Sequence, residues 1–309
     1  MAKDDILSDI SLWRAAGDAE IEAAVRGIER KLRREFAFVA TRPHAGSDLR
    51  IATFLHIDQQ DEFVLIPGGA MQMGVSEDNR RAMAAIDETI WLPDQVIPKP
   101  HMVRVPPFLA ARRPIDRGTA LHRAGWPMAT EIFESYSPAE QQTFWQRAGS
   151  TPALMALAQI DRVITATKLA LPTEIQWEYL YRCGSSTLFP WGDDLPANQA
   201  AWKNILLADF RERVENDQAE NAFGVLGMQF GELCADLFEG EQAAVPSYEN
   251  PDDYADAPQV MRGGAAHFEP WKDSSWTLCI SGSRWDSQYN THGLCGARFV
   301  KNLPGYRKH

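Results

Sequence analysis

Cysteine is scarce in this sequence, and the few cysteines are far apart. The chain has 309 residues and four cysteines, with no C-x-x-C pair and no zinc-finger spacing: Cys183, Cys234, Cys279 and Cys295. This pattern argues against a disulfide scaffold and against a zinc finger. Free and mostly buried thiols are expected in a reducing compartment, so the chain is predicted to be cytoplasmic.

Long apolar runs and an excess of basic residues are also missing. No stretch approaches the roughly 20 apolar residues of a membrane-spanning helix. The acidic opening MAKDDILSDI lacks the basic and apolar regions of a signal peptide. The formal net charge is -11, which disfavours nucleic acids and membrane surfaces as partners. Hydrophobic residues make up 45% of the chain, which is enough for a globular core.

The first sixty residues differ in character from the rest. Four apolar residues recur at helical spacing between charged ones: Ile21, Val25, Ile28 and Leu32. They predict an amphipathic helix over residues 18–36, followed by a strand over residues 51–57. We expect the helix to dock on its own domain, and docking on a partner is left open. Residues 1–60 are therefore predicted to form an N-terminal helical segment, separate from a domain over residues 61–309.

From Glu62 onward, short apolar strands alternate with Gly/Pro turns. Residues 63–74 (FVLIPGGAMQMG) and residues 101–112 (HMVRVPPFLAAR) each predict two strands. The loop over residues 75–100 is long for a simple connection, which suggests a function. Capping sequences predict helices beginning after Ser137 and after Thr173. The chain is thus predicted to be α+β, with little regular secondary structure in its second half.

Five sequence blocks then identify a family. They occur in order: FVLIPGGAMQMG (63–74), LPTEIQWEY with FPWGDD (171–194), NAFGVLGM (221–228), VMRGG (260–264) and GARFV (296–300). Together they resemble formylglycine-generating-enzyme-like (sulfatase-modifying factor) domains from about Asp61 to Leu303. The resemblance implies a C-type-lectin-like fold. Within it, Arg262 and Arg298 are expected to hold loops through hydrogen bonds to carbonyls or carboxylates.

The sequence departs from the enzymes of that family. Members that oxidise a substrate cysteine carry two cysteines after the Arg-Gly-Gly motif, and these bind copper as thiolates. Here Phe268 stands at the first position, and the second falls near Asp273. The block that supports calcium in the family is replaced by residues 229–238, where Glu232 and Asp236 remain as oxygen donors. No catalytic residue, metal ligand or cofactor is predicted; calcium is left open, and copper is expected only in an oxidase.

The segment over residues 265–295 is rich in groups that make contacts. Tyrosine and tryptophan supply stiff contact area, and small polar residues supply adaptable hydrogen bonds. The predicted ligand-binding residues are His267, Phe268, Trp271, Trp285, Asp286, Gln288, Tyr289, Thr291 and His292. Trp276, which lies in an apolar stretch, is expected in the core instead.

The residues around this segment suggest how it is used. Ser281-Gly282-Ser283-Arg284 precedes its second part, and Gly296-Ala297-Arg298 follows it. This frame resembles the variable region of diversity-generating retroelement proteins, in which a fixed lectin-type scaffold displays substituted side chains. The ending Gly-Ala-Arg favours that resemblance over the oxidases.

The sequence is compatible with three functions. The first hypothesis is a non-enzymatic protein that binds a protein or peptide ligand through residues 265–295, with a retroelement variable protein as its special form. The alternative is a divergent formylglycine-generating-type oxidase acting on a cysteine or thiol, which predicts that Cys279 and Cys295 share a metal. The second alternative is a regulatory scaffold module that docks partners through the helix over residues 18–36.

Overall fold

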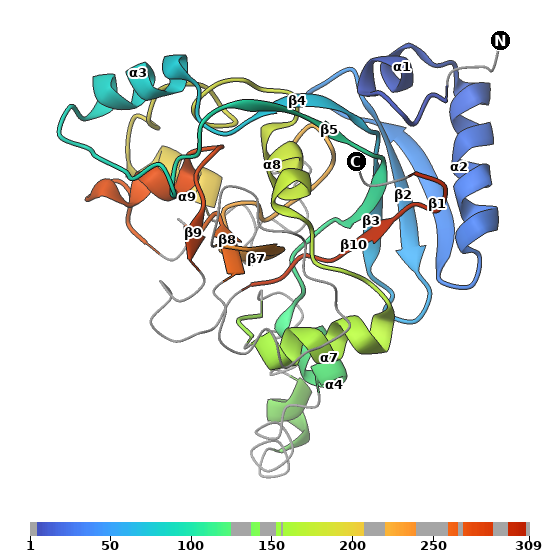
Figure 1. The fold of residues 1–309 in the computed structure, drawn as a ribbon. Coiled ribbons are helices and arrows are strands. Elements are labelled where there is room, and N and C mark those ends of the chain that lie inside the picture. Colours follow the sequence, from blue (N-terminus) through green and yellow to red (C-terminus); the bar gives the residue numbers. More distant parts are fainter. Residues whose placement is uncertain are drawn as a thin grey trace.

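The fold combines a sheet-rich part and a loop-rich part on either side of a central helix (Figure 1). The computed structural model describes residues 5–124, 137–142, 153–155, 157–206, 220–238, 259–264, 268–286 and 296–306. None of the helices in these ranges is both long enough and apolar enough to cross a bilayer.

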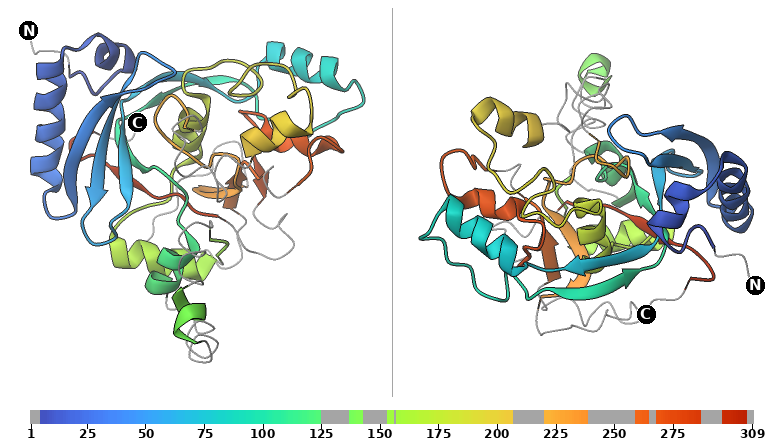
Figure 2. Two further views of the ribbon diagram at one scale, coloured as in Figure 1. Left: turned by 180° about the vertical axis from the view of Figure 1, so that it is seen from behind. Right: turned by 90° about the horizontal axis from the view of Figure 1, so that it is seen from above.

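The chain begins with two helices and a strand pair. Helix α1 (Ile10–Ala15) and helix α2 (Asp18–Leu32) precede β1 (Phe36–Pro43) and β2 (Arg50–His56). Helix α2 buries the predicted apolar stripe: Ile21, Val25, Ile28 and Leu32. It lies along the outer side of the sheet, far from α3 (Glu77–Ile86) (Figure 2). The structure thus confirms the prediction that this helix docks on its own chain.

A five-stranded antiparallel sheet joins the two ends of the chain. Its order is β1-β2-β3-β6-β10, with β3 at Glu62–Ile66, β6 at Phe108–Ala111 and β10 at Val300–Asn302. The N-terminal segment therefore supplies two strands to the same sheet as the rest of the chain. The division at residue 60 stays a prediction.

The predicted strand pairs over residues 63–74 and 101–112 are divided between two sheets. Strand β4 (Gly69–Met73) pairs with β5 (His101–Val105), whereas β3 pairs with β6. The change of sheet occurs at Pro67-Gly68 and at the prolines before β6, since proline interrupts strand pairing. The long loop between β4 and β5 contains helix α3, which begins where the Ser76 hydroxyl accepts a hydrogen bond from the Asn79 amide.

The remaining helices surround the middle of the fold. Helices α4 (Arg117–Ala124) and α7 (Leu157–Thr167) pack on each other below the sheet (Figure 1). Central helix α8 (Glu174–Arg182) contacts β4 and β5 on one side and the later strands on the other. Its first turn has the predicted cap, because Thr173 Oγ1 accepts from Gln176 N while Gln176 Oε1 accepts from Thr173 N.

The second half of the described chain contains short elements joined by loops. They are α9 (Gln199–Leu206), β7 (Glu232–Leu237), β8 (Gln259–Arg262), the 3-10 helix η4 (Ser274–Cys279) and β9 (Trp285–Asp286). Strands β7, β8 and β9 form a small antiparallel sheet. The predicted scarcity of regular structure in this half is confirmed.

Two hydrophobic clusters fill the interior. The first core lies between the five-stranded sheet, α2, α8 and the small sheet. The second core lies beneath α3, α9 and η4, and its largest buried members are Phe189, Trp202 and Trp276. Phe189 stacks on Trp191 with ring centroids 5.0 Å apart and meets Trp276 edge-on at 6.2 Å. Trp276 is thus in the core, as the sequence predicts, and Phe189 is buried beside it.

Candidate functional site

A buried arginine links α8 to the C-terminal segment. Arg262, at the end of β8, lies 3.1 Å from Glu174 and also pairs with Glu178, and it is fully buried. The same guanidinium donates to the carbonyls of Ser281 and Gly282, both at 3.3 Å. The predicted role of Arg262 is therefore confirmed: it binds two carboxylates of α8 and fixes the loop that follows η4.

A second buried arginine closes the other end of the segment. Arg298 pairs with Glu232 at 2.7 Å, and both side chains are fully buried. Arg298 also donates to the carbonyls of Ala111 and Leu226, at 2.8 and 2.5 Å. The indole of Trp177 donates to the same carboxylate at 2.9 Å. Burial raises the pKa of Glu232, while Arg298 and Trp177 oppose the rise.

Close backbone approaches fix both sides of the frame. A Cβ on Gly282 would lie 2.6 Å from the carbonyl of Gly74, and one on Gly296 would lie 2.6 Å from the Gly231 oxygen. Only glycine fits at such distances. The amide of Arg284 also donates to the Val96 carbonyl at 2.8 Å. These contacts fix the backbone at residues 282–284 and at residue 296, which lie on either side of residues 287–295 in the sequence.

The described part of the predicted binding surface is only partly exposed. Phe268 is 46% exposed. Trp271 and Trp285 are half-buried and pack against the second core, and Trp285 also packs against the first. Trp285 and Asp286 form β9, which pairs with β8. The polar neighbours of Trp285 predict more exposure than this side chain has.

The other predicted binding residues lie outside the described ranges: His267, Gln288, Tyr289, Thr291 and His292. The structure therefore places Trp271 and Trp285 against the second core, with Asp286 next to Trp285 in β9 and Phe268 partly exposed. The rest of the surface stays a prediction.

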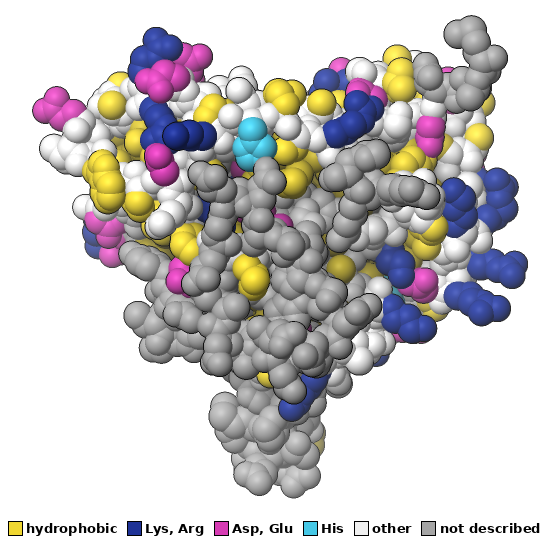
Figure 3. Space-filling model, in the orientation of Figure 1, with side chains coloured by type: hydrophobic (Ala, Val, Ile, Leu, Met, Phe, Trp, Pro, Cys, Tyr) yellow, Lys and Arg dark blue, Asp and Glu magenta, His cyan; other side chains and the backbone are white. Residues whose placement is uncertain are grey.

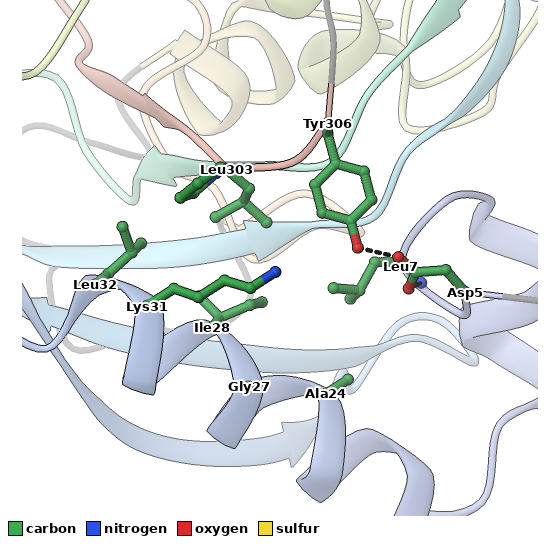
Figure 4. Close-up of a pocket in the computed structure, with 10 residues that line it drawn as sticks. Asp5, Leu7, Ala24, Gly27, Ile28, Lys31, Leu32, Leu303 and Tyr306 are labelled. Carbon is green, nitrogen blue, oxygen red and sulfur yellow. Dashed lines mark hydrogen bonds between the residues drawn. The ribbon is translucent and has the colours of Figure 1, made fainter.

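Three hollows on the described surface were not predicted from the sequence. The smallest, of about 180 Å3, lies between α2 and the C-terminal residues. Its walls are mainly apolar, and the Tyr306 hydroxyl donates to Asp5 at one end, with Lys31 beside it (Figure 4). This contact joins the two ends of the described chain and is structural.

The second hollow, of about 440 Å3, lies where β3 begins and β6 ends. It is lined by Asp61, and Asp116 also borders it. Burial, with a smaller contribution from Asp116, raises the pKa of Asp61 to about 6. Arg123 opposes the rise but does not cancel it. A carboxyl group at this pKa changes its charge close to neutral pH.

The third hollow, of about 560 Å3, lies beside the loop between α3 and β5. Its apolar lining includes Trp91, which is 78% exposed. The length of the loop over residues 75–100 is the one sequence signal that pointed to this place.

The family model of the sulfatase-modifying factor enzyme 1-like domain matches residues 53–303. The chain belongs to this family. The match, together with the antiparallel sheets and short helices, confirms the predicted fold class: an α+β chain with the formylglycine-generating-enzyme-like fold.

Individual relatives of this sulfatase-modifying-factor-like chain are distant. YfmG of Bacillus subtilis (strain 168), itself an uncharacterized protein, is 25% identical over 290 residues, which covers 81% of this chain and 56% of YfmG. The chain thus spans little more than half the length of that relative.

Two solved structures are similar over most of the chain. PvdO from Pseudomonas aeruginosa is 16% identical, with a TM-score of 0.46, covering 85% of this chain and 100% of PvdO. Variable protein 1 of Treponema denticola is 14% identical, with a TM-score of 0.43, covering 86% of this chain and 98% of the other. These remote likenesses say nothing of what this chain binds.

The described residues do not fit the copper site of the family's oxidases. Phe268 occupies the first expected position, and Asp273 caps η4 by accepting from the Ser275 amide at 2.8 Å. Cys279 is fully buried, and burial raises the pKa of its thiol. Cys295 lies outside the described ranges, so its predicted proximity to Cys279 stays a prediction.

The other two cysteines are also unlike reactive thiols. Cys183 ends α8 in a left-handed conformation, and its thiol donates to the Leu180 carbonyl at 3.0 Å. Burial raises its pKa to about 12. Cys234 is fully buried, and burial raises its pKa as well. Low thiolate content makes all three described thiols poor nucleophiles and poor metal ligands near neutral pH.

The two oxygen donors of the degraded calcium block are used by the protein itself. Glu232 binds Arg298 and Trp177, and Asp236 accepts from the Glu174 amide at 2.5 Å. Among the described residues, no group of three or more histidine, cysteine or acidic side chains could hold a metal ion. These donors therefore do not fit calcium as they stand.

Proposed function

We propose that this protein is a non-enzymatic binding protein that engages protein or peptide ligands through the surface of residues 265–295. The observation that supports this most directly is the chemistry after the Arg-Gly-Gly motif. An aromatic ring that is 46% exposed, Phe268, stands where the oxidases carry the first cysteine. A helix-capping carboxylate, Asp273, stands near the second position. Such a pair can contact a ligand but cannot form a thiolate site.

The rigid frame gives the second support. Arg262 and Arg298 hold the two sides of the frame through buried ion pairs and bonds to carbonyls. Gly282 and Gly296 leave no space for a side chain. The flanking residues that are fixed in this way lose little conformational entropy when a ligand binds beside them, which favours affinity.

A selection experiment tests the proposal. A random peptide library would be selected on the full chain, and the dissociation constants of enriched peptides would be measured by fluorescence anisotropy. We expect Phe268→Ala to weaken these peptides about 10-fold or more, because exposed aromatic anchors dominate such interfaces. The melting temperature should stay near that of the wild type, as for most surface substitutions.

The matched control is Val39→Ala, which removes another exposed apolar side chain, on β1 and outside residues 265–295. It should leave the affinities unchanged. Equal binding by the wild type and by Phe268→Ala would contradict the proposed surface. Copper-dependent oxidation of a thiol peptide by the purified chain would contradict the non-enzymatic assignment.

A narrower version of this proposal is that a retroelement diversifies the codons of the binding segment, residues 265–295. Its support is the frame itself, with fixed residues 281–284 and 296–298 on either side of residues 287–295. The gene would be sequenced in several isolates. A near-copy of these codons beside a reverse transcriptase, with differences confined to adenines, is the expected result. An invariant gene without a copy would remove this form and leave the binding proposal in place.

A further inference from the structure

The loop between α3 and β5 holds a tryptophan in solvent beside a groove. Trp91 is 78% exposed, the largest exposed fraction among the large hydrophobic side chains of the described residues. The groove beside it, of about 560 Å3, is lined by Arg80, Met83, Ile90, Trp91, Leu92, Pro93, Asp94, Gln95 and Ile97. We call this hollow the Trp91 groove. The exposed indole and the apolar side chains beside it form a candidate contact surface.

The loop that carries Trp91 is firmly supported. Arg80, on α3, donates to the Ile97 carbonyl at 2.9 Å and lies 3.3 Å from Asp94. Val96 and Ile97 are buried in the second core, and Ile90 and Leu92 pack against it on either side of Trp91. The indole is therefore presented by a fixed backbone, which makes it an anchor that loses little entropy on binding.

The loop that carries the Trp91 groove contacts the C-terminal segment of the proposed function. The Val96 carbonyl accepts from the Arg284 amide at 2.8 Å, and the next residue, Trp285, packs against the same second core. The two segments thus share one core and one backbone hydrogen bond. This contact ties the backbone of the loop to that of the C-terminal segment.

The charges of the loop that carries the groove favour a basic ligand. Residues 75–100 hold five acidic side chains and three basic ones, a net charge of -2. Arg80 is paired with Asp94 and Arg81 with Asp78, so the remaining charged residues of the loop are three acidic ones and one basic one. At the end of the molecule that carries α3, acidic and basic side chains both lie beside hydrophobic ones (Figure 3). The formal net charge of the whole chain, -11, adds to this attraction.

We propose that the Trp91 groove docks a protein segment in which a large apolar side chain is flanked by lysine or arginine. The apolar side chain packs on the indole and the aliphatic lining, and the basic residues pair with exposed carboxylates of the loop such as Glu77 and Glu88. This inference rests on the proposed function, since it extends the same binding face and names the chemistry of its ligand.

The test uses two short fluorescein-labelled peptides and the full chain. One peptide has a central Leu-Phe pair flanked by lysines, and the other has the same centre flanked by glutamates. We expect the lysine peptide to bind about 10-fold more tightly, with a difference that shrinks as salt is raised. Trp91→Ala should weaken the lysine peptide about 10-fold or more, and Trp91→Phe should retain most of the affinity.

The matched control is Met102→Ala, because Met102 is 68% exposed on β5 and does not line the groove. It should bind the lysine peptide like the wild type. Replacing Glu77 and Glu88 by lysine should reverse the preference towards the glutamate peptide, because both side chains are exposed in the acidic loop.

The outcomes separate this inference from the proposed function. Unchanged binding by Trp91→Ala, or no preference between the two peptides, would overturn the groove assignment. If library-selected peptides lose affinity in Phe268→Ala but not in Trp91→Ala, the proposed function stands and the groove is wrong. If library selection yields no peptide at all, the proposed function is contradicted, and the groove inference that rests on it falls with it. A loss of affinity in Trp91→Ala that Trp91→Phe restores supports the groove.

Discussion

Backbone N–H and C=O groups find hydrogen-bond partners in different ways in the five-stranded sheet and in the loop-rich region over the second core. In the sheet, β1 and β2 pair from Phe36 with His56 to Pro43 with Arg50, so backbone groups bond to each other. In the loop-rich region, side chains provide many of these bonds, as when Tyr181 donates to the Cys279 carbonyl at 2.9 Å. Buried backbone groups need partners in either case. A fold with short strands must therefore bury polar and charged side chains.

Among the substitutions that test this comparison, Arg262→Ala should have the largest effect on stability. The substitution leaves Glu174 and Glu178 buried without their shared cation and removes bonds to two carbonyls. We expect the free energy of unfolding, measured by urea denaturation, to fall by about 5 kcal/mol. The control is Arg26→Ala on α2, whose ion pairs are exposed, and it should not move the urea midpoint. A loss as small in Arg262→Ala as in the control would break the comparison.

Phe189→Ala tests whether the second core is energetically separate. Phe189 is fully buried between aromatic rings, so its removal leaves a cavity. We expect a loss of about 3–4 kcal/mol in the free energy of unfolding. Hydrogen exchange should accelerate in α3 and η4 while β2 and β3 keep their protection. Equal acceleration in the five-stranded sheet would show that the two cores open together.

Asp61→Asn, a substitution beside the five-stranded sheet, should raise the free energy of unfolding, whereas the two substitutions above lower it. The pKa of Asp61 is raised from 3.8 to about 6, so between these pH values the folded state holds a proton that the unfolded state lacks. The free energy of unfolding of the wild type therefore falls as pH rises through about 6. Asp61→Asn should raise it by about 2 kcal/mol near pH 8, with little effect below the ordinary pKa. Thermal melts across this range measure the difference, and a gain that is independent of pH would contradict it.

Local features of the sequence predicted much of the structure. The stripe from Ile21 to Leu32 and the cap at Thr173 depend on residues a few positions apart, and both are as predicted. The roles of Arg262 and Arg298 followed from buried charges that need partners. The family match supports the five sequence blocks.

Features that depend on distant contacts were not predicted. The separation of β3 from β4 into two sheets is decided by β6 and β5, which are far along the chain. Helix α9 was missed because its surroundings are rich in Gly, Asp and Asn, which are typical of loops. The half-buried state of Trp285 depends on its position between two cores, whereas its sequence neighbours are polar.

The position of β10 has a consequence for the order of folding during synthesis. Strand β10 pairs with β6, yet the ribosome makes β6 long before it makes Val300. Until then, one edge of β6 has no strand beside it, and exposed edges pair readily with other chains. The five-stranded sheet therefore closes only after translation has passed its last strand. A chaperone that covers this edge of β6 should raise the yield of folded protein more than one that covers α2, which is complete early.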